Sequence, residues 1–365
     1  MKIMRSDQIS ISQLTVLNTS MILGLSILTL PRATSEKIGT PDVWMSIIIA
    51  GLISVLLAVV CAKVSRRFPG ETLFDYNNQI VGKAIGMAFS VVFCVYYILM
   101  AAFEVRMQAE VIRQFLLDQT PIEVTMIVFL IVAGYLLLGQ INPIARLMEF
   151  LLPITYISIL FVMLLSIQDF DINKLRPVLS EGIRPVFSGL LSTALSYSGF
   201  ECIMVFSAFV DKPKKMVLSA IIGVALIIVL YTINAVIVID VLGVSEASTL
   251  TWPTLELIKN VEMAGFFLEN FEVIFIAVWL VEIFTTYIVS HYIASLGISK
   301  MFGININYVH IGLLVVIYFV GIYPSDLNGS IKLGELIGNL SLFTAGIMPI
   351  LLLLIATLRK RGRIP

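Results

Sequence analysis

The sequence is poor in charged residues. Only 13% of its 365 residues are Asp, Glu, Lys or Arg, whereas about 25% is usual in soluble domains. Hydrophobic residues make up 59% of the chain, and the mean hydropathy is +1.00. Residues 43–62 contain no charged side chain, and about 20 such residues cross the hydrocarbon core of a bilayer. This composition excludes an ordinary soluble domain and predicts an all-α polytopic membrane protein in a lipid bilayer.

Cysteine and histidine are also scarce. The three cysteines, Cys61, Cys94 and Cys202, lie in apolar segments and are too far apart for a CxxC pair, so we expect them to be buried. The two histidines are distant in sequence. The sequence therefore predicts no metal site and no cofactor. It contains no phosphate-binding glycine loop and no credible Ser–His–Asp set, so we do not expect an enzyme.

Ten apolar segments are long enough to enter a bilayer. We place them at residues 12–33, 43–62, 85–103, 122–139, 149–167, 186–209, 216–239, 271–298, 306–323 and 336–358. The first and the sixth contain glycine and hydroxyl residues where a spanning helix is normally rich in leucine, and we expect both to be broken. Ten spans with these breaks predict two five-helix repeats, residues 1–182 and 183–365, the second inserted with inverted orientation.

Basic residues predict the orientation of the spans, because cytoplasmic segments carry the excess of Lys and Arg. With the N-terminus inside, the inner segments hold fifteen basic and five acidic residues, and the outer segments hold nine basic and seventeen acidic ones. We therefore expect both termini to be cytoplasmic. The basic run at residues 359–363 is interpreted as an anchor facing anionic lipid, and no nucleic-acid partner is expected.

The two predicted breaks are the first candidates for a binding site. Gly24 lies in the first break with Ser26 two residues later, and Gly199 lies in the second after Ser198. Unwound backbone at such a point exposes amides and carbonyls to a ligand near the middle of the membrane. The alternative is close helix packing, for which small residues are also used.

Three acidic residues fall in or near the spans. Glu104 shares a helical face with Tyr97, which favours an ion or water path, since charge at that depth is costly. The alternative is an interfacial Glu104 paired with Arg106. Glu201 follows the second break directly and is the stronger candidate for that path. Glu282 precedes Thr286 by one helical turn, so that hydroxyl either faces the cavity or bonds to its own helix.

Five stretches of the chain are distinctive: residues 28–33 (LTLPRA), 170–182 (FDINKLRPVLSEG), 251–254 (TWPT), 284–287 (FTTY) and 323–326 (YPSD). They resemble the B subunit of the Ger-type spore germinant receptors, within the amino acid–polyamine–organocation transporter superfamily. The resemblance implies a transporter fold that works as a nutrient sensor in the inner membrane of a spore. It also implies a larger membrane-embedded A subunit and a lipoprotein C subunit as partners, and a germinant such as an amino acid, sugar or nucleoside.

The resemblance also implies a ligand pocket. Carried over by position, it falls at Gly24, Tyr96, Ser198, Thr286 and, in the last span, Phe343. Helical phase instead favours Tyr97 over Tyr96, and both stay open. Ser26 stands where the family often has a second glycine, which implies a shallower break. Ser198 stands where an apolar residue is frequent, which implies a more polar pocket.

Two functions fit these observations. The first is a nutrient-sensing subunit that triggers germination with its partners. The second is a proton- or sodium-coupled amino acid transporter. Broken helices and buried carboxyl groups serve both, and the family-specific loops favour the receptor.

Overall fold

The computed structural model describes residues 7–167, 170–259 and 271–362. Basic residues at both ends of the chain that entered the orientation argument, Lys2, Arg5 and Arg363, lie outside these ranges. Within them the chain is helical, and an isolated bridge between Ile9 and Val210 is the one strand-like pairing among the described residues.

The first half of the chain contains five spans and one short helix. The first span is the pair α1 (Ile11–Leu23) and α2 (Ser26–Ile38), which are bent by 49° at the break between them. It is followed by α3 (Val43–Arg66), the short α4 (Leu73–Val81), α5 (Lys83–Phe115), α6 (Ile122–Leu137) and α7 (Ile141–Leu165).

The second half begins with a span made of short pieces. After η2 (Ile172–Leu175) come α8 (Arg184–Ser188), α9 (Ala194–Tyr197), η3 (Phe200–Cys202), α10 (Ile203–Phe206) and η4 (Ser207–Phe209). The rest is η5 (Pro213–Lys215), α11 (Met216–Thr249), α12 (Pro253–Lys259), α13 (Phe271–Phe302), α14 (Ile306–Ile322), α15 (Leu327–Ser341), the π-helical η6 (Leu342–Ile347) and α16 (Met348–Leu358).

The predicted fold class is confirmed. Within the described ranges, six helices are long and apolar enough to cross a bilayer, and the bent pair α1–α2 makes a seventh span. Shorter apolar helices at Ile122–Leu137, Phe200–Phe209 and Ile306–Ile322 occupy the other three predicted positions. The breaks fall in the first and sixth spans, as expected. The division into repeats at residue 182 stays a prediction.

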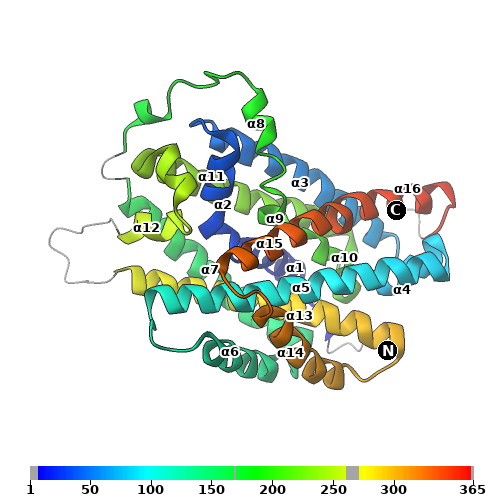
Figure 1. Cartoon of the computed structure of the whole chain (residues 1–365). Helices are drawn as coiled ribbons and strands as arrows, with labels where there is room; N and C mark the ends of the chain where they lie inside the picture. Colours follow the sequence, from blue (N-terminus) through cyan, green and yellow to red (C-terminus); the bar gives the residue numbers. More distant parts are fainter. Residues whose placement is uncertain (1–6, 168–169, 260–270, 363–365) are drawn as a thin grey trace.

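The broken helices lie at the centre of the bundle. α1 packs against α7, α11 and α13, while α5 runs along α13 and α3 runs along α11 (Figure 1). The buried side of α1 includes Asn18, Thr19 and Ser20. Polar residues at the centre of a membrane bundle are costly unless the fold uses them, so the region around α1 is where a site is expected.

One end of the bundle is closed by contacts between loops and helix ends. α4 lies there beside the last turns of α13 and α16 (Figure 1). Lys300 of α13 forms an ion pair with Asp75 of α4, and the Arg359 guanidinium donates to the Ile80 carbonyl at 3.0 Å. The N-terminal segment joins this end, because the Ile9 N–H donates to the Phe209 carbonyl at 2.8 Å. The start of the first broken helix is thereby attached to the end of the second.

The ion pair at this end makes stability depend on pH. Burial raises the pKa of Asp75, but the hydrogen bond and charge of Lys300 and the hydrogen bonds from Thr72 outweigh it and lower that pKa overall. The contribution of the carboxylate is therefore complete above pH about 4 and is lost as the pH falls through the lowered pKa.

We expect Asp75→Asn to cost roughly 0.5–1 kcal/mol at neutral pH, as partly exposed ion pairs do, and to flatten the loss of stability below pH 4. The measurement is the thermal midpoint of the purified protein in detergent between pH 3 and 7, with the exposed Asp118→Asn as control. If both variants follow the same curve, Asp75 is not the titrating group.

Candidate functional site

The first break, and Pro31 within α2, leave backbone carbonyls without helical partners, and side chains from distant helices donate to them. The Tyr231 hydroxyl of α11 donates to Ile22 at 2.7 Å and to Leu23 at 3.2 Å. Four further donors complete the set: Trp279 Nε1 to Gly24 at 3.3 Å, Thr286 Oγ1 to Ser20 at 3.0 Å, and Asn234 Nδ2 and Thr254 Oγ1 to Ile27 at 2.8 and 2.9 Å. Unpaired carbonyls are costly in a membrane. These hydrogen bonds satisfy the carbonyls and so lower the free-energy cost of interrupting the helix.

Three of the predicted site residues meet at Gly24. A Cβ atom added there would lie 2.9 Å from Thr286 Oγ1 and 3.2 Å from Glu104 Oε1. The structure therefore places side chains of α5 and α13 directly on the first break, with no room for a larger residue. The Thr286 hydroxyl donates to the Ser20 carbonyl across the helix interface at 3.0 Å and lies 3.3 Å from the Glu282 carbonyl of its own helix. Thr286 lines neither of the two spaces beside the breaks.

Glu104 is buried without a cation beside it. Arg106, the alternative partner, instead forms an ion pair with Glu110 at 2.8 Å, and Arg113 binds the other oxygen of Glu110 at 2.6 Å. The interfacial pairing of Glu104 with Arg106 is therefore wrong. The Glu104 carboxyl faces the backbone amide of Leu25, and its Oε2 has no hydrogen-bond partner among the described residues.

The second break is organised around Glu201. Its Oε2 accepts from the Gly199 N–H at 2.9 Å, and its Oε1 lies 3.4 Å from the Tyr97 hydroxyl. Tyr96 also faces Glu201, as well as Ser198. The sequence left open which tyrosine belongs to the site. Both rings are buried, lie 5.0 Å apart and face the same carboxyl group.

The two breaks touch each other. Gly199 has φ +119°, and a Cβ atom there would lie 2.8 Å from the Met21 carbonyl oxygen of α1. Met21, in the last turn of α1 before the first break, and Gly199 of the second break are therefore in van der Waals contact, although they are 178 positions apart in the sequence. Glu104 lies at the first break and Glu201 at the second, so the residues predicted for the ion or water path lie beside those predicted for the pocket.

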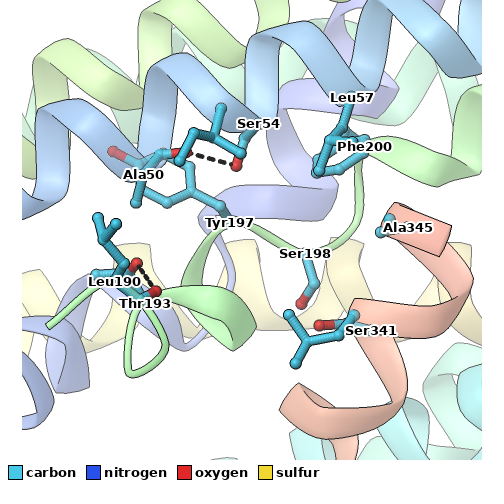
Figure 2. Close-up of a pocket in the computed structure, with 13 residues that line it drawn as sticks. Ala50, Ser54, Leu57, Leu190, Thr193, Tyr197, Ser198, Phe200, Ser341 and Ala345 are labelled. Carbon is cyan, nitrogen blue, oxygen red and sulfur yellow. Dashed lines mark hydrogen bonds between the residues drawn. The ribbon is translucent and has the colours of Figure 1, made fainter. Parts of the chain in front are cut away.

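Two spaces lie beside the breaks. The smaller, about 10 Å³, is lined by Gly24, Ser26 and Glu104 and has room for about one water molecule. The larger, about 130 Å³, lies behind the second break, between α3, α9 and the π-helical turn of the last span (Figure 2). It is lined by Ala50, Ile53, Ser54, Leu57, Leu190, Thr193, Tyr197, Ser198, Phe200, Ser341, Leu342, Ala345 and Gly346.

The larger cavity has no charged lining residue. Two of its hydroxyls are occupied locally, since Ser54 donates to Ala50 and Thr193 donates to Leu190 (Figure 2). The Ser198 hydroxyl points toward Ser341 across the space (Figure 2). Such a lining suits an uncharged group, whereas the carboxyl groups lie on the other side of the break.

Phe343 lies apart from both spaces. Its ring packs edge-to-face on Phe89 of α5, with centroids 5.6 Å apart, and it lines neither cavity. Tyr231, Trp279 and Asn234, in contrast, contact the first break and were missed in the sequence. A polar side chain within a long apolar helix was the available signal for Asn234.

The two histidines lie close together, although they are distant in sequence. Their rings are 5.5 Å apart. His291 Nε2 donates to the His310 carbonyl at 3.2 Å, so its Nδ1 accepts from the Tyr287 hydroxyl at 2.7 Å. In the described part of the chain, no three His, Cys, Asp or Glu side chains are grouped as metal ligands are.

The chain is similar to proteins of spore germination over nearly its whole length. The family described as "Spore germination protein" matches residues 8–330. Spore germination protein YndE of Bacillus subtilis (strain 168) is 37% identical over 98% of each chain. Spore germination proteins A2 and B2 of the same organism are 33% and 32% identical, and the matches cover 93% and 91% of this chain and 93% and 90% of those proteins.

Solved transporter structures share the fold. MhsT in complex with L-phenylalanine has a TM-score of 0.69 at 12% identity, covering 94% of this chain and 97% of its own. Mhp1, a nucleobase-cation-symport-1 family transporter, has a TM-score of 0.71 at 13% identity, covering 98% and 80%. Identities this low bear on the fold alone. With the family match and the curated relatives, they show that the chain is a multi-pass membrane protein of the spore germination protein family, built on a transporter fold.

Proposed function

We propose that this protein is the nutrient-sensing membrane subunit of a spore germinant receptor. It binds a small nutrient such as an amino acid where its two broken helices meet. It lies in the inner membrane of the spore with both termini cytoplasmic. It triggers germination together with a larger membrane-embedded A subunit and a lipoprotein C subunit.

The observation that carries this proposal is the carboxyl group of Glu104 beside the first break. It is 3% exposed, has no cation partner and faces the backbone amide of Leu25. A ligand ammonium would give that carboxyl the charge partner it lacks. A ligand carboxylate would be stabilised at the N-terminus of α2, which has no side-chain cap.

Binding at this site requires the helices to move. The space beside Gly24 is about 10 Å³, too small for an amino acid, so the structure is a closed arrangement of the site. A ligand that fits only an opened arrangement shifts the population toward it by its difference in affinity for the two. That shift is what the partner subunits would detect.

We expect Gly24→Ala to weaken the nutrient response without preventing insertion into the membrane. The added methyl group would crowd Thr286 and Glu104, and overpacking of this kind costs about 1–3 kcal/mol. If that cost falls on the ligand-bound state, about fivefold or more nutrient is needed for half-maximal response.

The measurement is release of dipicolinic acid from spores that lack the gene, rescued with the wild-type or variant gene and exposed to amino acids, sugars and nucleosides. Gly312→Ala is the control, since a methyl group there meets no atom within 4 Å. A normal response in Gly24→Ala spores would contradict the pocket assignment. Loss of response to one nutrient class in the deletion strain would identify the class of nutrient that the protein senses.

A coupled amino acid transporter is the second candidate, favoured by the fold that the chain shares with MhsT and Mhp1. Uptake of radiolabelled nutrient by proteoliposomes separates the two. Accumulation driven by a proton or sodium gradient supports the transporter. Saturable binding without accumulation supports the receptor.

A further inference from the structure

We propose that Glu282 of α13 is a proton-binding site. In the closed arrangement its carboxyl group carries a proton that links α13 to the inner half of the first broken helix. This inference goes beyond the proposed function and does not depend on which nutrient is bound.

Glu282 is fully buried where α1, α7 and α13 meet. Its Oε2 accepts from the Thr155 hydroxyl of α7 at 3.0 Å. Its Oε1 has no hydrogen-bond partner among the described residues, and neither has the Ser20 hydroxyl of α1, toward which the carboxyl group faces. The Ser20 hydroxyl can pair with either form of the acid, since it can donate to a carboxylate or accept from a protonated Oε1. The charges around the carboxyl group therefore decide its protonation state.

The other titratable groups around Glu282 do not supply a counter-charge. Glu104 faces it from α5, and Tyr231 faces it from α11. α1 and α7 contribute only the hydroxyls of Ser20 and Thr155. The ion pairs in the described part of the chain include neither Glu282 nor Glu104. A bare carboxylate here would be a buried charge beside a second acid, which the neutral form avoids.

A metal cation fits this place less well than a proton. A hard cation needs several oxygen ligands, typically carboxylates and backbone carbonyls. The carbonyls of the first break from Ser20 to Gly24 that lie nearby already accept from Thr286, Tyr231 and Trp279. The Thr285 hydroxyl is also engaged, with the Glu282 carbonyl at 2.7 Å.

The step itself is a simple protonation. The carboxylate takes one proton from water to form an O–H bond at Oε1, and this O–H donates to Ser20 Oγ. Oε2 keeps its bond from Thr155. Loss of the proton turns the Ser20 hydroxyl into a donor to the carboxylate and leaves a buried charge with no cation partner among the described residues, so the folded state is expected to lose stability as the site deprotonates.

The test is equilibrium unfolding of the purified full chain in detergent over a pH series. If the folded state holds one proton that the unfolded state releases, the folding equilibrium constant falls tenfold per pH unit between the two titration points. Glu282→Gln keeps the shape of the side chain and can donate to Ser20. We expect the folding equilibrium constant of this variant to depend less steeply on pH, by the tenfold per pH unit that one proton contributes. The exposed Glu335→Gln is the matched control and should leave the slope unchanged.

An unchanged slope in Glu282→Gln would overturn the proposal. If that variant does not fold, Thr155→Val decides: Thr155 donates to the carboxyl group at 3.0 Å, so its loss disfavours the charged form and should extend the fall in stability to higher pH, and an unmoved curve would contradict the assignment. Repeating the series with sodium chloride against choline chloride tests for a metal. Stabilisation by sodium that depends on Glu282 would replace the proton with a cation. None of these measurements uses germination, so failure here is distinct from failure of the receptor assignment.

Discussion

Gly199→Ala is expected to prevent recovery of folded protein. Gly199 has φ +119°, a conformation that residues with a side chain rarely adopt, and the added Cβ would lie 2.8 Å from the Met21 carbonyl oxygen. The neighbour is backbone, which cannot turn aside as the end of a side chain can. Backbone strain costs about 1–3 kcal/mol, and overpacking adds a similar amount. Native proteins are stable by only about 5–15 kcal/mol, so together these costs remove a large part of the total.

The measurement is the yield of monodisperse protein after detergent extraction, together with its thermal midpoint. Gly303→Ala is the matched control, because Gly303 also has a positive φ, +69°, but a Cβ atom there meets nothing within 4 Å. The difference between the two variants isolates the contact between the breaks. If both lose the same stability, the breaks are not in tight contact.

Arg106→Met is expected to destabilise the protein by about 3 kcal/mol or more. Arg106 is buried with Glu110, their side chains being 5% and 4% exposed, and their ion pair is 2.8 Å long. Removing one partner of a buried pair leaves an uncompensated charge and typically costs about 3–5 kcal/mol. Arg113 also binds Glu110, but its side chain is 49% exposed and compensates only in part.

The ion pair offers its own controls. Arg113→Met removes the exposed partner of the same glutamate and should cost at most about 1 kcal/mol. Combining Arg106→Met with Glu110→Gln removes both charges and should recover most of the loss. Unfolding in detergent measures all of these variants. Equal effects of Arg106→Met and Arg113→Met would contradict the burial of this pair.

The pairing of Arg106 with Glu110 rather than with Glu104 was predictable from spacing. Glu104 and Arg106 are two positions apart and point to different sides of a helix, whereas Arg106 and Glu110 are four apart and share a face. The alternative in which Glu104 pairs with Arg106 conflicts with this geometry. The choice between Tyr96 and Tyr97, in contrast, could not be predicted from spacing. Helical phase separates the two rings, but it cannot show that the second break brings Glu201 close to both.

Hydropathy and the positions of glycine were sufficient to locate ten membrane segments and the two breaks, because the bilayer dictates helix length and leaves few ways to interrupt a helix. They also brought Gly24, Glu104 and Thr286 forward as candidates. The tertiary structure, in contrast, decided which side chains donate hydrogen bonds to the freed carbonyls of the first break. The donors Tyr231, Trp279 and Thr286 come from helices more than 200 positions away, and no local pattern in a sequence records a partner at that distance.

The same reason explains the rest of the site. The open Oε1 of Glu282, the cavity behind the second break and the remote place of Phe343 depend on how three or more helices pack against one another. A residue's own helix determines which face it lies on, but its partner and the space left beside it are set by the side chains of the helices packed against it.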